Sequence, residues 1–304
     1  MDAGLRDPLL RVLIHGHVWL ACGAAAQTWS MQHLMGLSGW RAPAVAGLAA
    51  FAGYAFMRSA RAGHPTLGLS PQLQWTATHR PALLGAAMLA ALVALAVAAH
   101  HVPDLVLRSA PVALAVLLYV VPAPWVRGRT VGLRRVPLLK AFLIAACWAR
   151  TTVHLPQLFA PADRLPQGIG WLFAMQMCFF LSLALVFDLR DRVIDRDVVL
   201  TVPQLVGSVG TRVLAVLLML YPAAVFASLA FVGHALSPVG SSFSWPADMV
   251  LTALAYLAVA VLVARSTAER GPLHFGLVLD GALLLPPLAQ ALASMPWATI
   301  VSPG

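Results

Sequence analysis

Acidic residues, and charged residues in general, are scarce in this chain of 304 residues. Asp and Glu together number 11, and only 10% of the residues are charged, against about 25% in an average soluble domain. Hydrophobic residues make up 60% of the chain, and the mean hydropathy is +0.82. This composition excludes a disordered chain and an ordinary soluble enzyme, and it predicts a protein with several transmembrane helices.

Cysteine is also rare, with three residues in the whole chain. Cys22, Cys147 and Cys178 each lie inside an apolar run, and they form no CxxC motif. This pattern excludes a secreted domain held together by disulfides. We interpret the three side chains as small buried hydrophobic groups.

Nine apolar segments are long enough to span, or nearly span, a bilayer, which takes about 20 residues per helix. They cover residues 9–29, 42–58, 82–101, 105–123, 137–157, 168–187, 211–233, 247–265 and 273–295. Prolines between the segments favour helix ends there. Since no separate soluble part is visible, we expect residues 1–304 to form one transmembrane domain, an all-α bundle of nine helices.

The distribution of Lys and Arg predicts the orientation of this bundle, because cytoplasmic loops of membrane proteins are enriched in them. With nine helices and a cytoplasmic N-terminus, all but four of the 20 Lys and Arg residues face the cytoplasm. The four exceptions are Arg41, Arg108, Arg150 and Arg164. We therefore expect an integral protein of the inner or cytoplasmic membrane with its C-terminus outside. The net charge of +9 then needs no nucleic acid to explain it.

Four of the 11 acidic residues lie within the sequence FDLRDRVIDRD, at the end of the sixth apolar segment. At 100° per residue, Asp188, Asp191 and Asp195 share a helical stripe about 60° wide, and Asp197 points away. Such a stripe predicts a Mg²⁺ site that also holds a diphosphate, because Mg²⁺ prefers carboxylates and phosphate oxygens. The alternative is a solvated loop with ion pairs such as Asp188–Arg192.

The segment FDLRDRVIDRD followed by LTVPQLVG resembles the second aspartate-rich motif of the UbiA superfamily of intramembrane prenyltransferases. That resemblance implies a nine-helix bundle that transfers a polyprenyl group from its diphosphate to an aromatic or lipid acceptor. Typical members also carry a first motif, NDxxDxxxD, after the second helix. The matching region, residues 54–75, contains no Asp, Glu or Asn. Whether the chain is an active enzyme therefore stays open.

The resemblance implies roles for individual residues. Asp188, Asp191 and Asp195 would bind Mg²⁺, and Asp191, Asp195 and Lys140 would be catalytic. Arg58, Arg192 and Lys140 would contact the diphosphate, and Tyr54 and Asp280 would line the cavity for the acceptor. For Arg58 and Lys140 the alternative is that they extend to the lipid headgroups. For Asp280, which lies within the last span, the alternative is a structural pair with a buried arginine.

Three functions remain open on the sequence alone. The first is a UbiA-like prenyltransferase, whose partners are a polyprenyl diphosphate, a hydrophobic acceptor and the lipid bilayer. The second is a non-catalytic relative that binds an isoprenoid or escorts a partner enzyme. The third, a small-molecule transporter, is disfavoured because the sequence shows no convincing inverted repeat.

Overall fold

The protein is almost entirely helical in the computed structural model, which describes residues 7–62, 71–120, 123–126, 129–131, 136, 138–161, 169–192, 200–236 and 245–295. The α-helices are α1 (Pro8–His15), α2 (Val18–Leu34), α3 (Arg41–Arg61), α4 (Pro71–Thr78), α5 (Arg80–Val97), α6 (Val102–Val120), α7 (Leu139–Leu158), α8 (Ile169–Asp191), α9 (Val202–Leu236), α10 (Trp245–Ala264) and α11 (Leu285–Ala293). Short 3₁₀ turns are η2 (Ala99–His101) and η6 (Ala282–Leu284), and η5 (His274–Leu279) is a π-helix.

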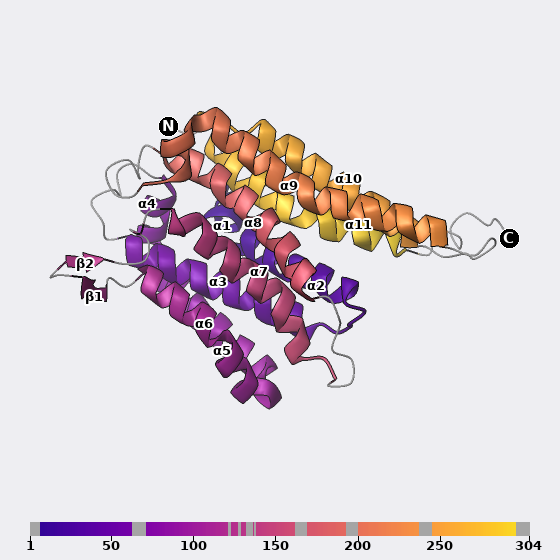
Figure 1. Ribbon diagram of the computed structural model, residues 1–304. Coiled ribbons are helices and arrows are strands. Elements are labelled where there is room, and N and C mark those ends of the chain that lie inside the picture. Colours follow the sequence, from indigo (N-terminus) through magenta and orange to yellow (C-terminus); the bar gives the residue numbers. More distant parts are fainter. Residues whose placement is uncertain are drawn as a thin grey trace.

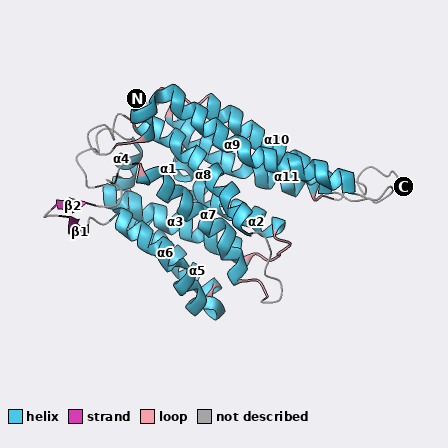
Figure 2. Cartoon of the chain, in the orientation of Figure 1, coloured by secondary structure: helices cyan, strands magenta, loops and turns pink. Residues whose placement is uncertain are grey.

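The helices lie in an elongated bundle with α8 at its centre. Figure 1 shows α9, α10 and α11 as a layer along one side, with α7 and α8 beneath it and α5 and α6 on the opposite side. Helix α8 packs against α7, α9 and α10, and α3 packs against α2 and α5. Two short strands, β1 (Ala123–Val126) and β2 (Arg129–Val131), pair antiparallel and are the only strands in the described residues (Figure 2).

Within the part of the chain that the structure describes, five helical segments are long and apolar enough to cross a membrane. They are Arg80–Val97, Ile169–Asp191, Val202–Val232, Ala247–Ala264 and His274–Ala293. The pair α1 and α2 is a sixth candidate if its two helices, bent by 53°, form one span. The expectation of an all-α protein with apolar helices for a bilayer is confirmed at this level.

The count of nine helices is not confirmed, since eleven α-helices are present in the described residues. The first predicted segment is split into α1 and α2, and α4 is a short helix that hydropathy did not reveal. The last predicted segment is divided among η5, η6 and α11. A hydropathy pattern reports the length of apolar chain and not whether the helix within it is continuous.

Apolar side chains cover both the inside and the outside of the bundle. Phe179, Phe226 and Tyr256 are fully buried, whereas Leu107 is 75% exposed and Phe231 is 76% exposed. A soluble protein rarely exposes so many large apolar side chains on its helices. Outward-facing side chains of this kind are suited to contact with lipid.

The two interrupted spans, α1–α2 and η5–α11, lie against each other. The indole N–H of Trp19 donates to the backbone oxygen of Leu277 at 3.1 Å, and the amide of Gln27 donates to the backbone oxygen of Leu283 at 2.6 Å. Backbone groups that a broken helix leaves unpaired need such partners inside a membrane. Side chains of α2 thus stabilise the irregular turns of the last span.

Candidate functional site: a charged cluster

An ion pair joins α7 to the C-terminal part of α8. The Nζ atom of Lys140 lies 2.7 Å from Oδ1 of Asp188 and 3.8 Å from Oδ2 of Asp191. The side chains of Lys140 and Asp188 are only 9% and 5% exposed. Residues three apart on a helix share a face, which explains why one lysine reaches both carboxylates. The structure thus brings together three residues to which the resemblance gives catalytic or binding roles.

Arg190 belongs to the same cluster. Its Nε donates to Oδ1 of Asp191 at 2.8 Å. Its guanidinium carbon lies 5.1 Å from the ring centre of Phe187 and 5.4 Å from that of Phe275, within the range of cation–π contacts. The two rings and the carboxylate together fix the position of the guanidinium.

The sequence did not predict a role for Arg190. On a helical wheel it lies opposite Asp188, and an idealised wheel ignores how far a long arginine side chain reaches along the helix surface. The signal that was available is Phe187, three residues earlier on the same face. Phe275 could not be found in this way, because it comes from the last span.

Asp280 and Arg58 complete the cluster from two further segments. The carboxylate of Asp280 interacts electrostatically with Arg190 and Arg58, and Arg58 also acts on Asp191. Asp280 follows the π-helix η5, and Arg58 lies in the last turn of α3. Two cationic side chains thus act electrostatically on the carboxylate of Asp280. Among the described residues, the charged cluster therefore consists of six groups with balanced charge: Arg58, Lys140, Asp188, Arg190, Asp191 and Asp280.

An aromatic group lies beside the cluster. The hydroxyl oxygen of Tyr54 accepts a hydrogen bond from the indole N–H of Trp148 at 3.3 Å, and Trp148 stacks on Phe180 with ring centres 5.0 Å apart. Tyr54 lies one helical turn before Arg58 on α3. Tyr54, which is predicted to line the cavity for the acceptor substrate, is thus close to the cluster along α3 and in contact with α7.

Arg192 is not part of the cluster. It is exposed, and its Nη1 donates to the hydroxyl of Ser208 on α9 at 3.1 Å. The predicted ion pair Asp188–Arg192 is replaced by the pair of Asp188 with Lys140. Asp195 and Asp197 lie outside the described residues, so the third carboxylate of the predicted stripe has no structural description.

Three carboxylates lie in the described part of the cluster, on Asp188, Asp191 and Asp280. Within the residues that the structure describes, no three His, Cys, Asp or Glu side chains are grouped as metal ligands. Asp188 and Asp191 each lie within 4 Å of a cationic side chain, which supplies the positive charge that a metal would bring. Magnesium binding by Asp188, Asp191 and Asp195 stays a prediction, because Asp195 lies outside the described residues.

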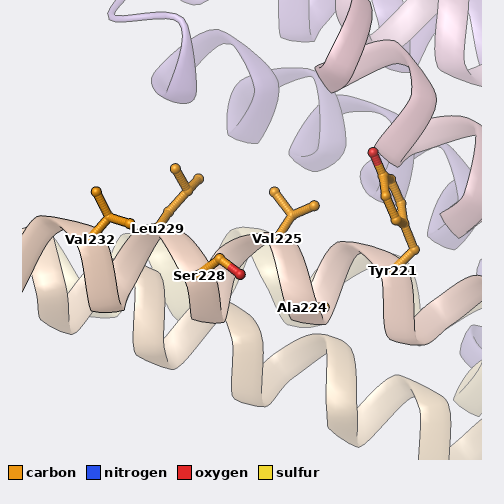
Figure 3. Close-up of a pocket in the computed structure, with 6 residues that line it drawn as sticks. All are labelled: Tyr221, Ala224, Val225, Ser228, Leu229 and Val232. Carbon is orange, nitrogen blue, oxygen red and sulfur yellow. The ribbon is translucent and has the colours of Figure 1, made fainter.

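An apolar groove lies on α9. No residue of the charged cluster lines it. It has a volume of about 350 Å³ and is lined by Tyr221, Ala224, Val225, Ser228, Leu229 and Val232 (Figure 3). The spacing of three and four residues places this lining on one face of the helix. Such a face has the chemistry of a contact with lipid chains and offers few groups for catalysis.

Comparison of the chain with family models, with curated proteins and with solved structures gives no match in any of the three. The resemblance to the UbiA superfamily therefore rests on the motif residues themselves.

Proposed function

We propose that the protein binds the diphosphate of a polyprenyl diphosphate at the charged cluster and transfers the prenyl group to a hydrophobic acceptor, as UbiA-like proteins do. The single observation that carries this proposal is the convergence of Arg58, Lys140 and Arg190, from three different helices, in a bundle suited to a membrane. Cations are costly inside a membrane protein and tend to mark functional sites there.

The chain's own residues supply the chemistry for such a substrate. A guanidinium has five N–H donors, and the bond of Arg190 to Asp191 uses the one on Nε. Lysine and arginine donors stabilise the charge that develops on a departing diphosphate. The apolar helices around the cluster limit access of water to the reacting carbon. Magnesium, if Asp195 joins Asp188 and Asp191 in holding it, would add further charge stabilisation.

A second candidate is a protein that binds an isoprenoid diphosphate without transferring it. The observation in its favour is that Asp188 and Asp191 are already paired with Lys140 and Arg190. These cations compete with a metal ion for the carboxylate oxygens. A protein that only binds the diphosphate through its cations needs no metal there.

We also propose the orientation that the positive-inside rule gives. In this orientation the charged cluster faces the cytoplasm, together with the N-terminus. Arg58, Lys140 and Arg190 belong to the 16 Lys and Arg residues assigned to that side. Water-soluble head groups would then enter from the cytoplasm, while the prenyl chain stays among the apolar helices.

The test is binding of farnesyl diphosphate to the full-length protein in lipid nanodiscs. We expect Arg58→Gln to weaken binding about tenfold, since one charged contact to phosphate is lost. The matched control is Arg270→Gln, at an exposed position after α10, which should leave affinity unchanged. Equal affinity of wild type and Arg58→Gln would overturn the proposal.

Release of pyrophosphate separates the two candidates. The prenyltransferase releases it from bound farnesyl diphosphate when an acceptor is supplied as a membrane extract, and the binding protein does not. Arg58→Gln should lower this release together with binding. Binding without release over many hours would favour the non-catalytic candidate.

A further inference from the structure

His17 interrupts the first span in an unusual backbone conformation. It lies between α1 and α2, whose axes differ by 53°, and it has φ 62° and ψ 13°. Residues other than glycine rarely adopt this left-handed conformation, which is found preferentially at functional sites. The surrounding structure must therefore hold His17 in place.

The imidazole of His17 is buried with an unpartnered nitrogen. The residue is 4% exposed, and its Nε2 has no hydrogen-bond partner. Buried polar atoms nearly always have a partner, so Nε2 is able to accept a hydrogen bond from a bound group or a water molecule. Since an unpaired charge is costly to bury, the neutral ring with an acceptor nitrogen is the favoured form.

The surroundings of His17 are aromatic and lie next to the charged cluster. Its ring centre is 5.9 Å from that of Tyr54, which in turn lies 6.2 Å from Trp148. His17 also interacts electrostatically with Arg58, a member of the cluster. Aromatic side chains stack favourably with flat aromatic ligands. A group bound here would lie between the aromatic rings and the cations.

We propose that Nε2 of His17 accepts a hydrogen bond from the hydroxyl group of an aromatic ligand that packs against Tyr54 and Trp148. That this ligand is the prenyl acceptor rests on the proposed function. The inferred hydrogen bond to His17 does not depend on the proposed function. A neutral imidazole with a buried acceptor nitrogen has the chemistry to bind a hydroxyl donor.

In the transfer reaction His17 takes a proton. The bond between C1 of the prenyl group and the diphosphate oxygen breaks, and its electron pair leaves with the diphosphate. The hydroxyl oxygen of the acceptor forms a new bond to C1, and the hydroxyl proton moves to Nε2 of His17, where the negative charge of the departing diphosphate offsets the positive charge of the imidazolium. The product is a prenyl ether, and the base is restored when the imidazolium returns its proton to water.

The test uses 4-fluorophenol as the probe and fluorobenzene as the matched compound without a hydroxyl. The full-length protein, labelled with ¹⁵N-histidine in lipid nanodiscs, is titrated with each compound while the ¹⁹F and ¹⁵N spectra are recorded. We expect about tenfold tighter binding of 4-fluorophenol, from the added hydrogen bond. The Nε2 resonance of His17 should shift with 4-fluorophenol and stay in place with fluorobenzene.

Two variants sharpen the result. His17→Asn keeps a hydrogen-bond acceptor and places a residue there that tolerates the left-handed conformation. It should therefore retain part of the preference for 4-fluorophenol over fluorobenzene. The ¹⁵N resonance that is missing from its spectrum is that of His17. His17→Phe removes the acceptor and should abolish the preference. If His17→Phe does not fold, the ¹⁵N shift of His17 in the wild-type protein decides whether the hydrogen bond to the hydroxyl forms. Equal affinity for the two compounds, or an unmoved His17 resonance, would overturn the inference.

Farnesyl diphosphate is measured on the same samples. The Asn variant should bind it with an affinity within about threefold of the wild type, because the charged cluster is intact. If the wild-type protein does not bind farnesyl diphosphate but prefers 4-fluorophenol, the proposed function is overturned and the inference about His17 is not. Normal diphosphate binding with no preference for 4-fluorophenol would overturn the hydroxyl site alone.

Discussion

Lys140 on α7 and Asp188 on α8 form a buried ion pair of 2.7 Å at the centre of the charged cluster. Removing one member of a buried pair leaves the other charge uncompensated, which costs about 3–5 kcal/mol. Replacing both members by apolar residues of similar size is often neutral, because neither charge then needs to be desolvated. The pair therefore predicts a strong coupling between the two positions.

We expect Lys140→Met to lower the free energy of unfolding by about 3 kcal/mol, and Lys140→Met combined with Asp188→Leu to restore most of that loss. Asp191, which also lies near Lys140, limits the restoration. Unfolding in mixed micelles provides the measurement, and Arg192→Gln at an exposed position is the control. A double variant as unstable as Lys140→Met would show that the pair is not the source of the effect.

The Asp280→Asn variant tests whether the diphosphate is bound by cationic side chains or through a metal ion that carboxylates hold. Its carboxylate interacts electrostatically with Arg190 and Arg58. Asp280→Asn leaves the cluster with one positive charge in excess, so affinity for farnesyl diphosphate should rise about threefold to tenfold. Titration in nanodiscs measures this affinity.

The control for Asp280→Asn is Asp248→Asn on α10. Asp248 interacts electrostatically with His33 and not with the charged cluster. The control should leave affinity for farnesyl diphosphate unchanged. Weaker binding by Asp280→Asn would instead indicate that the carboxylate takes part in holding the ligand.

Magnesium removal tests the role of Asp188 and Asp191. Since both carboxylates are paired with Lys140 or Arg190, we expect EDTA to change the affinity for farnesyl diphosphate by less than about threefold. Adding Mg²⁺ back after EDTA is the control for indirect effects of the chelator. Loss of binding with EDTA and its return with Mg²⁺ would support the magnesium site that the sequence predicts with Asp195.

The sequence predicted the helical, apolar character of the protein, because hydropathy reports long apolar segments directly. Of the nine expected spans, five or six are long and apolar enough among the described helices. The sequence did not predict where those helices break. The break at His17 lies inside the apolar segment 9–29, and the kink at Gly207, which has φ 73°, lies before the segment that begins at residue 211. Hydropathy does not report such breaks. The bond from Trp19 to Leu277 joins the first span to a segment far away in the chain.

The candidate site was predicted in part for a similar reason. The spacing of Asp188 and Asp191 follows from helix geometry, so their shared face could be expected. The roles of Arg190 and His17 depend on Phe275 and Tyr54, which are distant in the chain. A single sequence does not reveal such contacts between segments.

Gly276 in the π-helix η5 lies where the last span packs closely against α1 of the first span. A Cβ atom at this position would lie 2.4 Å from Cγ2 of Ile14 on α1. Gly276→Ala therefore forces α1 and the last span apart and should lower the free energy of unfolding by about 1–3 kcal/mol.

The matched control is Gly85→Ala, because a Cβ atom at Gly85 on α5 would meet nothing within 4 Å. This control should be neutral or stabilising by up to about 1 kcal/mol, since alanine favours helices more than glycine does. Both variants are unfolded side by side in mixed micelles. Because α1 ends two residues before His17, Gly276→Ala should also weaken binding of 4-fluorophenol, whereas Gly85→Ala should not. Equal stability of the two variants would show that α1 does not pack against η5 as closely as the structure indicates.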